Sequence, residues 1–357
     1  MSPQFKIMFR LALTSALFVT ALFALLIELS KFVPEWSAHP PNDYGIYVHW
    51  GTADRLGPEK YAYALPNYYP RPTTLWVFVP LSILPNWFAL FWTIVPLFFT
   101  LWLFKKPGVI LWLYYPMLVQ AATGQIDGWL LVPLLWLIEN LPWFAGIGAA
   151  LVLFKPQLSF AIVLFALIFW LSKKDVRNLS AFAATLCVLY LPAFITNPRW
   201  PLEMIDNMQV RANESILPTR GASLWAWAWH GGITLWLLPI ACIAAIVLVY
   251  YVFSVRGKRF QAVQLLGLLI TPVLYASNFV TIIPLLKTPR QIVILTLASW
   301  GAVIVDTLAG GWGGAYALIP LTALYLLARD TDQETTPPTP TSQTARSGTT
   351  AATTMDK

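Results

Sequence analysis

Residues 108–174 decide how this chain folds, and they read GVILWLYYPMLVQAATGQIDGWLLVPLLWLIENLPWFAGIGAALVLFKPQLSFAIVLFALIFWLSKK. The stretch contains four apolar runs, at residues 108–122, 128–138, 142–154 and 157–172. The interruptions between them are Gly124, Glu139-Asn140, Pro142 and Lys155-Pro156. A helix needs about 20 residues to cross the hydrocarbon core of a membrane, and these runs are shorter. We therefore expect half-helices or re-entrant segments whose backbone ends are shielded by protein.

The composition of the whole chain also indicates a membrane protein. Of its 357 residues, 58% are hydrophobic and only 11% are charged, whereas an ordinary soluble domain has about 25% charged residues. This excludes a soluble single-domain enzyme, a disordered protein and a fibrous repeat. The 18 Trp and 14 Tyr residues agree, because these side chains gather at membrane–water interfaces.

The positions of the basic residues predict the topology. The formal net charge is +7, and basic residues accumulate in the cytoplasmic loops of membrane proteins, so the charge does not predict a nucleic-acid partner. Basic groups stand at Lys6 and Arg10, Lys105-Lys106, Lys173–Arg177 and Arg256–Arg259. We therefore expect a multi-pass cell-membrane protein with a cytoplasmic N-terminus and a retained signal-anchor helix at 11–27. The polar segments 31–72 and 197–232 then lie on the extracytoplasmic side.

Counted by the hydrocarbon-length rule, the chain is an all-α polytopic membrane protein with about 10–12 transmembrane or half-membrane helices. We expect an amphipathic approach and one span within 73–104, and further spans at 179–196 and 233–253. The stretch 262–328 holds three or four segments, with breaks near Ser277-Asn278, Lys287–Arg290 and Gly310–Gly314. The membrane unit covers residues 1–329, and the Thr/Pro-rich tail at 330–357 is predicted to be disordered.

The two long polar loops lie on the same side, which favours a membrane enzyme with an extracytoplasmic substrate. A transporter more often places its key polar residues within the spans. Asp43 lies about one short helix beyond the first span, where its carboxylate can accept a proton from a hydroxyl group. The alternative is a loop acid or a helix cap, because Asn42-Asp43 is favourable N-cap chemistry.

Four short motifs occur in an order that resembles a known family. They are Asn42–Tyr47, Tyr68–Pro70, TGQIDGW at Thr123–Trp129 and FKPQ at Phe154–Gln157. Together they resemble glycosyltransferase family 87, whose members have the GT-C fold. The resemblance covers about residues 10–290. It implies a polytopic transferase that uses a polyprenyl-phosphate sugar, typically polyprenol-phosphate mannose.

The resemblance assigns roles residue by residue. Asp43 matches the family's acidic residue, the candidate base. Tyr69-Pro70-Arg71-Pro72 matches a Tyr-Pro-Pro-like turn with an arginine inserted, and Gly124-Gln125 and Lys155-Pro156 match the family's Gly-Gln and Lys-Pro pairs. Two departures stand out: Glu139–Pro142 lacks the basic residues usual in that turn, and Ala276–Phe279 replaces the family's late Ser-Pro and His positions.

Three polar residues at the interruptions are further candidates. Lys155 is a candidate phosphate ligand, and a cation between apolar runs is costly enough that we expect a partner for it. Its alternative is an interfacial lysine whose ammonium reaches water. Gln125 and Asp127 occupy one break, where they can bind sugar hydroxyls or cap a half-helix.

The loops supply the remaining candidates. Arg71, Arg211 and Arg220 can hold a phosphate, although a solvated arginine is the alternative for each. Tyr69 and His230 are candidate substrate contacts. The WAWAWH run that ends at His230 offers aromatic faces for a sugar, but an interfacial belt uses tryptophan equally well.

These observations lead to one functional hypothesis and two alternatives. We expect inverting transfer of a sugar, with mannose favoured, from a polyprenyl-phosphate donor to an extracytoplasmic lipid or glycan acceptor. Neither loop contains an Asp-x-Asp pair, and the chain has three histidines, so we expect neither a metal nor a cofactor. The alternatives are a lipid-linked glycan transporter, or flippase, and a non-catalytic membrane scaffold.

Overall fold

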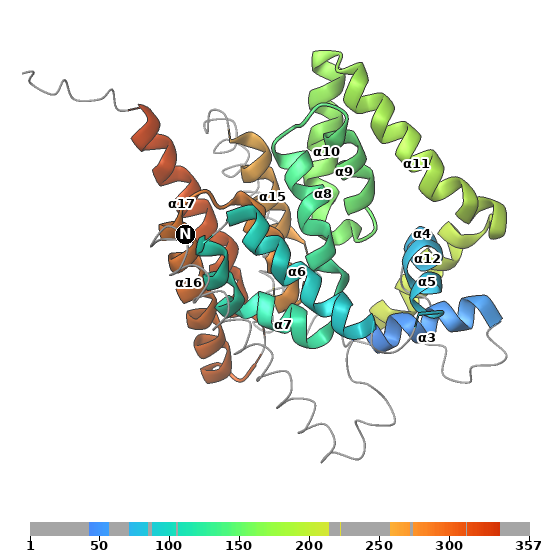
Figure 1. Ribbon diagram of the computed structural model, residues 1–357, viewed down its shortest axis with the longest axis horizontal. Coiled ribbons are helices and arrows are strands. Elements are labelled where there is room, and N and C mark those ends of the chain that lie inside the picture. The colour runs from blue at the N-terminus through green and yellow to red at the C-terminus, as the bar shows by residue number, and fades with distance from the viewer. Residues whose placement is uncertain are drawn as a thin grey trace, which may run out of the picture.

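The computed structural model describes residues 43–56, 71–84, 88–104, 106–213, 222, 258–271, 274–311 and 313–335. All the regular structure in these ranges is helical, which confirms the all-α expectation (Figure 1). The first part contains α3 (Asp43–Leu56), α4 (Arg71–Thr73), η2 (Thr74–Phe78), α5 (Val79–Leu81), α6 (Phe88–Phe104), η3 (Lys106–Leu113), α7 (Tyr115–Thr123), η4 (Ile126–Leu130) and α8 (Leu131–Ile138). The second part contains α9 (Phe144–Val152), α10 (Pro156–Lys173), α11 (Val176–Thr196), α12 (Trp200–Asn213), α15 (Arg259–Ile270), η5 (Ala276–Leu285), α16 (Pro289–Leu308), η6 (Gly314–Ala317) and α17 (Leu318–Thr335).

Three of the described helices, α10, α11 and α16, are long and apolar enough to cross a membrane. A fourth candidate is a bent pair formed by 115–123 and 126–138, in which the chain direction changes by 115° at the break. Other apolar helices, such as α15 and η5, are shorter. The predicted total of about 10–12 segments includes 11–27 and 233–253, which lie outside the described residues, so that total stays a prediction.

The interruptions predicted within 108–174 are where the helices end. Helix α7 ends at Gly124, which has a φ of 69°, a left-handed conformation that glycine adopts without steric cost. The turn after α8 contains Asn140, with a φ of 48°. Helix α10 begins with Pro156, which has no N–H group to leave unpaired in the first turn. The predicted breaks are confirmed here, but the expectation of a half-helix at 157–172 is wrong, because this run forms α10, which is long enough to cross a membrane. The run at 108–122 is divided between η3 and α7.

The stretch 262–328 contains four segments, namely α15, η5, α16 and the continuous η6–α17 helix, and one break is displaced. Helix α15 ends at Ile270 and η5 begins at Ala276, so Ser277 and Asn278 lie in the first turn of η5. The later breaks fall after Leu285 and after Leu308, close to the predicted positions. Asp306, an acid near the end of the apolar helix α16, accepts a hydrogen bond from the Gly313 amide at 2.6 Å. Helix α17 continues to Thr335, past the predicted domain boundary at 329.

The core forms where α7, α8, α10, α15 and η5 meet, and its largest fully buried side chains include Trp170, Tyr114 and Phe279. Helix α9 packs between α8 and α11. A Cβ atom on Gly148 would lie 2.3 Å from the Pro133 carbonyl oxygen, so only glycine permits this approach of α9 to α8. The outward faces of the candidate spans carry exposed apolar side chains such as Phe160, Ile195 and Leu297, as lipid contact requires.

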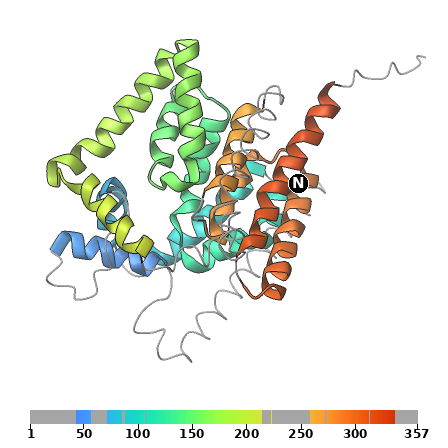
Figure 2. The same cartoon turned by 180° about the vertical axis from the view of Figure 1, so that it is seen from behind.

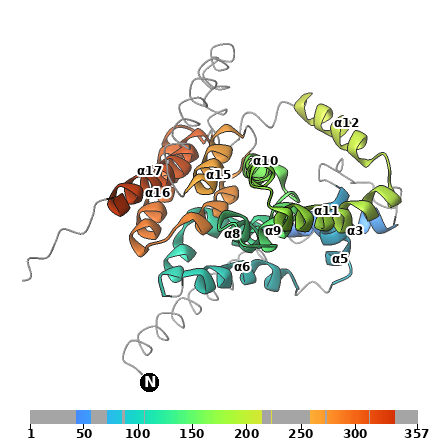
Figure 3. The same ribbon diagram turned by 90° about the horizontal axis from the view of Figure 1, so that it is seen from above.

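The helices divide into a bundle and a smaller group at one end. Figures 1 and 2 show α8, α9 and α10 side by side, with α16 and α17 beyond them. Helix α11 leads away from the bundle toward α12, and Figure 3 shows α12 to one side of α3 and α5. Helix α3 lies at the end remote from the basic turn Lys173–Arg177, in both Figure 1 and Figure 2.

Candidate functional site

Lys155 is buried between α9 and α10, with 2% of its side chain exposed. Its Nζ lies 2.5 Å from Asp127 Oδ1 and 2.8 Å from Gln125 Oε1. The expectation of a partner is therefore confirmed. The alternative of an interfacial lysine is wrong, because the ammonium group is enclosed by protein.

Asp127 receives hydrogen bonds at both carboxylate oxygens. It lies in the first turn of η4 and is fully buried. Its Oδ2 accepts a hydrogen bond at 2.6 Å from Asn278 Nδ2, and the Asn278 Oδ1 accepts one at 2.7 Å from the Tyr275 amide. Asn278 was not predicted as a site residue. The available signal was an amide side chain in an apolar run, next to a predicted break.

Helix α3 reaches the same group through Tyr47. The buried Tyr47 hydroxyl donates a hydrogen bond of 3.0 Å to Gln125 Oε1, and its ring stacks on Phe78 with centroids 4.4 Å apart. Tyr47 was also missed as a site residue, although it lies in a motif that carries the family resemblance. Asp43 is the first residue of α3. It precedes Tyr47 by one helical turn, so the two positions share a face of the helix.

We call Tyr47, Gln125, Asp127, Lys155 and Asn278 the buried polar cluster. Its members come from four separate segments, namely α3, the break around η4, the turn before α10, and η5. Removing a lysine and a carboxylate from water costs several kcal/mol per ion. The amide and hydroxyl partners offset this cost, so the cluster fixes the relative positions of the four segments.

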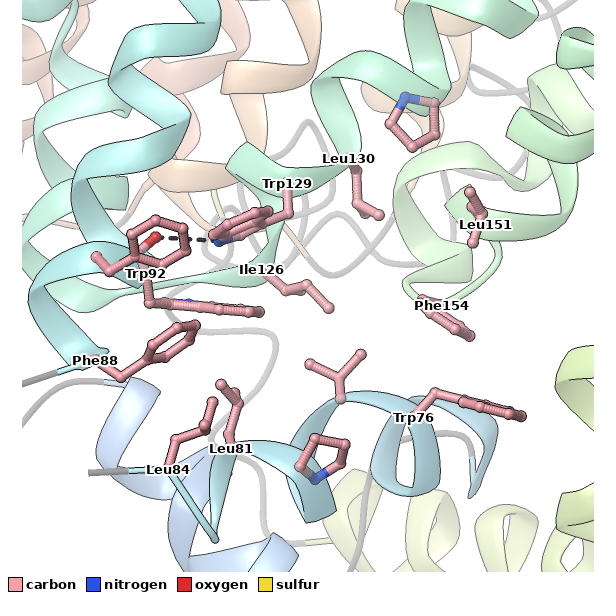
Figure 4. Close-up of a pocket in the computed structure, with 14 residues that line it drawn as sticks. Trp76, Leu81, Leu84, Phe88, Trp92, Ile126, Trp129, Leu130, Leu151 and Phe154 are labelled. Atoms are coloured by element: carbon pink, nitrogen blue, oxygen red, sulfur yellow. Dashed lines mark hydrogen bonds between the residues drawn. The ribbon is translucent and has the colours of Figure 1, made fainter. Parts of the chain in front are cut away.

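An apolar cavity of about 470 Å³ lies beside the buried polar cluster (Figure 4). Its walls come from η2, α5, α6, η4 and the end of α9, and they include Trp76, Leu81, Phe88, Trp92, Trp129 and Phe154. Several residues that line the cavity are neighbours of cluster residues along the chain. Ile126 and Trp129 flank Asp127, and Phe154 precedes Lys155. An apolar ligand can occupy this cavity, and the side chains of the cluster are not among the residues that line it.

Arg71 begins α4 near the same cavity. Thr73, two residues later, donates a hydrogen bond of 2.9 Å to the Phe154 carbonyl oxygen. Burial lowers the pKa of the Arg71 guanidinium, and the charge of Glu203 raises it in part. Because Glu203 belongs to the first turn of α12, this charge interaction links the second polar loop to the first.

The structure brings together three of the predicted site residues, Gln125, Asp127 and Lys155, and places Arg71 on a neighbouring helix. Arg211 lies on α12, but its side chain, like that of Asp43, is outside the described part of the structure. Tyr69, Arg220 and His230 lie outside the described residues altogether. Within the residues that are described, no group of three His, Cys, Asp or Glu side chains is arranged to hold a metal ion.

Comparison with protein-family models, with curated proteins and with solved structures gives no match for this chain.

Proposed function

We propose that this protein is a membrane glycosyltransferase that moves a sugar from a polyprenyl-phosphate donor to an extracytoplasmic lipid or glycan acceptor. Mannose is the favoured sugar. The observation that carries the proposal is the apolar cavity beside the buried polar cluster, to which the helix that begins at Asp43 is attached. The order of motifs resembling glycosyltransferase family 87 supports the same chemistry.

The cavity suits the lipid part of the donor. A polyprenyl chain is apolar, so it can enter an apolar cavity from the bilayer without the desolvation cost that polar walls would impose. The walls supply tryptophan, phenylalanine, leucine and proline side chains. In Figure 4 the side chains of Trp92, Trp129 and Phe88 lie on one side of the cavity, with Phe154 and Leu151 on another.

The phosphate requires cations that can approach it. Arg71 is one candidate, because it begins α4, whose Thr73 is hydrogen-bonded to the cavity-lining residue Phe154. Arg211 and Arg220 are the further candidates. A guanidinium group can donate two parallel hydrogen bonds to a phosphate. Lys155 would reach a phosphate only by leaving Asp127 and Gln125. We therefore propose that Lys155 holds the break around η4 in place rather than binding the phosphate itself. Tyr69 and His230 are the proposed contacts to the sugar or the acceptor.

The proposed reaction is a direct displacement. The acceptor hydroxyl oxygen attacks the anomeric carbon while its proton passes to the Asp43 carboxylate. The bond between the anomeric carbon and the phosphate oxygen breaks, and the polyprenyl phosphate leaves with the electron pair, stabilised by the arginines. A single displacement inverts the configuration at the anomeric carbon.

Reconstituted protein tests this proposal. Vesicles containing the full chain would receive radiolabelled polyprenyl-phosphate mannose, polyprenyl-phosphate glucose or a nucleotide sugar, each with an extract of membrane glycolipids. We expect label to move to an acceptor from a polyprenyl-phosphate sugar and not from the nucleotide sugar. Absence of transfer from every polyprenyl-phosphate sugar would contradict the proposal.

A second candidate, transport of a lipid-linked glycan, has one observation in its favour. The bent helix pair has Asp127 and Lys155 at its break, and transporters place buried charges at discontinuous helices. Vesicles with a fluorescent glycolipid in one leaflet separate the two functions. Movement of the glycolipid between leaflets without sugar transfer would favour transport.

A further inference from the structure

We propose that Tyr47 is a positioning residue that holds α3, and with it Asp43, in register with the buried polar cluster. This inference rests on the proposed function for the role of Asp43. The structural part of the inference, the attachment of α3, can be tested without any transfer reaction.

Helix α3 lies outside the main core. Its buried residues Tyr47 and Trp50 belong to a small separate apolar group with Phe78, Leu81, Trp92 and Ile126. Helix α3 packs on η2 and α5, two short elements that themselves border the cavity. Among the described residues this apolar group is much smaller than the main core. We therefore expect α3 to open more readily than the bundle, so that a directional contact to a rigid group has a large effect on its position.

The rigid group is the Lys155–Asp127 pair. The Tyr47 hydroxyl and the Lys155 ammonium donate to the same atom, Gln125 Oε1, at 3.0 and 2.8 Å. The Gln125 amide therefore bridges α3 to the ion pair. One end of this connection is fixed in the core through Asn278, and the other is one turn from Asp43 along α3.

The backbone packing of α3 also fixes its position. A Cβ atom on Gly51 would lie 1.9 Å from the Phe78 carbonyl oxygen. Gly51 follows Tyr47 by four residues, so both positions share the face turned toward η2. The close approach at Gly51 sets the distance of α3 from η2, and the Tyr47 hydroxyl sets its position along the cavity.

The test compares Tyr47→Phe with Tyr114→Phe in the purified full chain. Tyr47→Phe keeps the ring that stacks on Phe78 and removes only the hydroxyl. Tyr114 is a matched control, because its buried hydroxyl donates a hydrogen bond of 3.0 Å to the Phe279 carbonyl oxygen, away from α3. Hydrogen–deuterium exchange of the amides in 43–56 is the first readout. We expect a rise of about tenfold in Tyr47→Phe, the change that corresponds to about 1.4 kcal/mol, and no rise in Tyr114→Phe.

Transfer kinetics supply the second readout. Small displacements of a catalytic group lower the rate of the chemical step, so we expect kcat to fall about tenfold in Tyr47→Phe while KM for the donor stays within about twofold. Tyr114→Phe keeps the wild-type kcat. Gly51→Ala provides an independent route, since it displaces α3 without removing either partner of the hydrogen bond, and we expect it to raise exchange in 43–56 and lower kcat as well.

The outcomes separate this inference from the proposed function. Three outcomes would overturn the positioning role. They are unchanged exchange of the α3 amides in Tyr47→Phe, an equal rise of that exchange in Tyr114→Phe, and an unchanged kcat in Tyr47→Phe when its α3 amides exchange faster. If the wild type transfers no sugar while Tyr47→Phe still releases α3, the attachment of α3 is supported and glycosyl transfer is contradicted.

Discussion

Two lysine–carboxylate pairs, at two different breaks in the helical framework, show how differently the same chemistry can be used. Lys155 and Asp127 are 2% and 0% exposed, whereas Lys287 and Glu139 are 50% and 37% exposed. The first pair has amide partners at both ends, from Gln125 and Asn278. The second pair joins the turn after α8 to the segment before α16, in a hydrated setting.

The difference in burial indicates which of the two pairs contributes to the stability of the fold. A buried pair is tolerated only when its hydrogen bonds are complete, and removing one partner leaves an uncompensated charge. An exposed pair competes with water and salt and contributes at most about 1 kcal/mol. We therefore expect the site to depend on Lys155–Asp127 and to be nearly indifferent to Lys287–Glu139.

The largest effect is expected from breaking the buried pair. Asp127→Ala should lower the free energy of unfolding by about 3–5 kcal/mol, because it leaves the Lys155 ammonium buried without its carboxylate. Denaturant unfolding of the protein in detergent micelles measures this loss. The double variant Asp127→Leu with Lys155→Met is the control, since it removes both charges and should recover much of the stability. A single variant as stable as the wild type would contradict this role of the pair.

A smaller loss is expected when only a supporting amide is removed. Asn278→Leu takes one donor from Asp127 Oδ2 and should cost about 2 kcal/mol, the usual range for a hydrogen bond to a charged group. The same unfolding measurement applies. If Asn278→Leu matched Asp127→Ala in its effect, the ion pair would not be the dominant contact of the cluster.

The smallest effect is expected at the exposed pair. Lys287→Gln should change the free energy of unfolding by less than about 1 kcal/mol, and the difference should shrink as salt is added. Unfolding at low and at high ionic strength tests this. A loss comparable to that of Asp127→Ala would show that the exposed pair also holds the fold, and would remove the contrast between the two pairs.

The sequence was sufficient to predict most of the breaks within 108–174, although not the one between η3 and α7. Gly124 has no Cβ atom and can take a left-handed conformation, Pro156 is favourable in the first turn of a helix, and Glu139-Asn140 is polar in an apolar stretch. Each signal is local, so it needs no knowledge of the neighbouring segments. The break before η5 was predicted at the wrong place because the local signal was misleading there. Ser277 and Asn278 are polar, as loop residues are, but they are buried inside a helical turn.

The sequence alone could not predict which acidic residue pairs with which lysine. Asp127, Glu139, Lys155 and Lys287 were all recognisable as charges within or beside apolar runs, and the structure pairs these four with one another. The partners are separated by 28 and 148 positions, and nothing local indicates which acid meets which lysine. Tyr47 and Asn278 were missed for the same reason, since their roles depend on segments that meet only in the folded chain.

The measurement that tests the central proposal most directly is the initial rate of sugar transfer by Asp43→Asn in reconstituted vesicles. Asp54→Asn is the matched control, because it removes the same charge about 16 Å further along α3. A general base contributes about 10²–10⁴ in rate, so we predict a fall of at least about 100-fold for Asp43→Asn and a wild-type rate for Asp54→Asn. A wild-type rate for Asp43→Asn would contradict the assignment of Asp43 as the base.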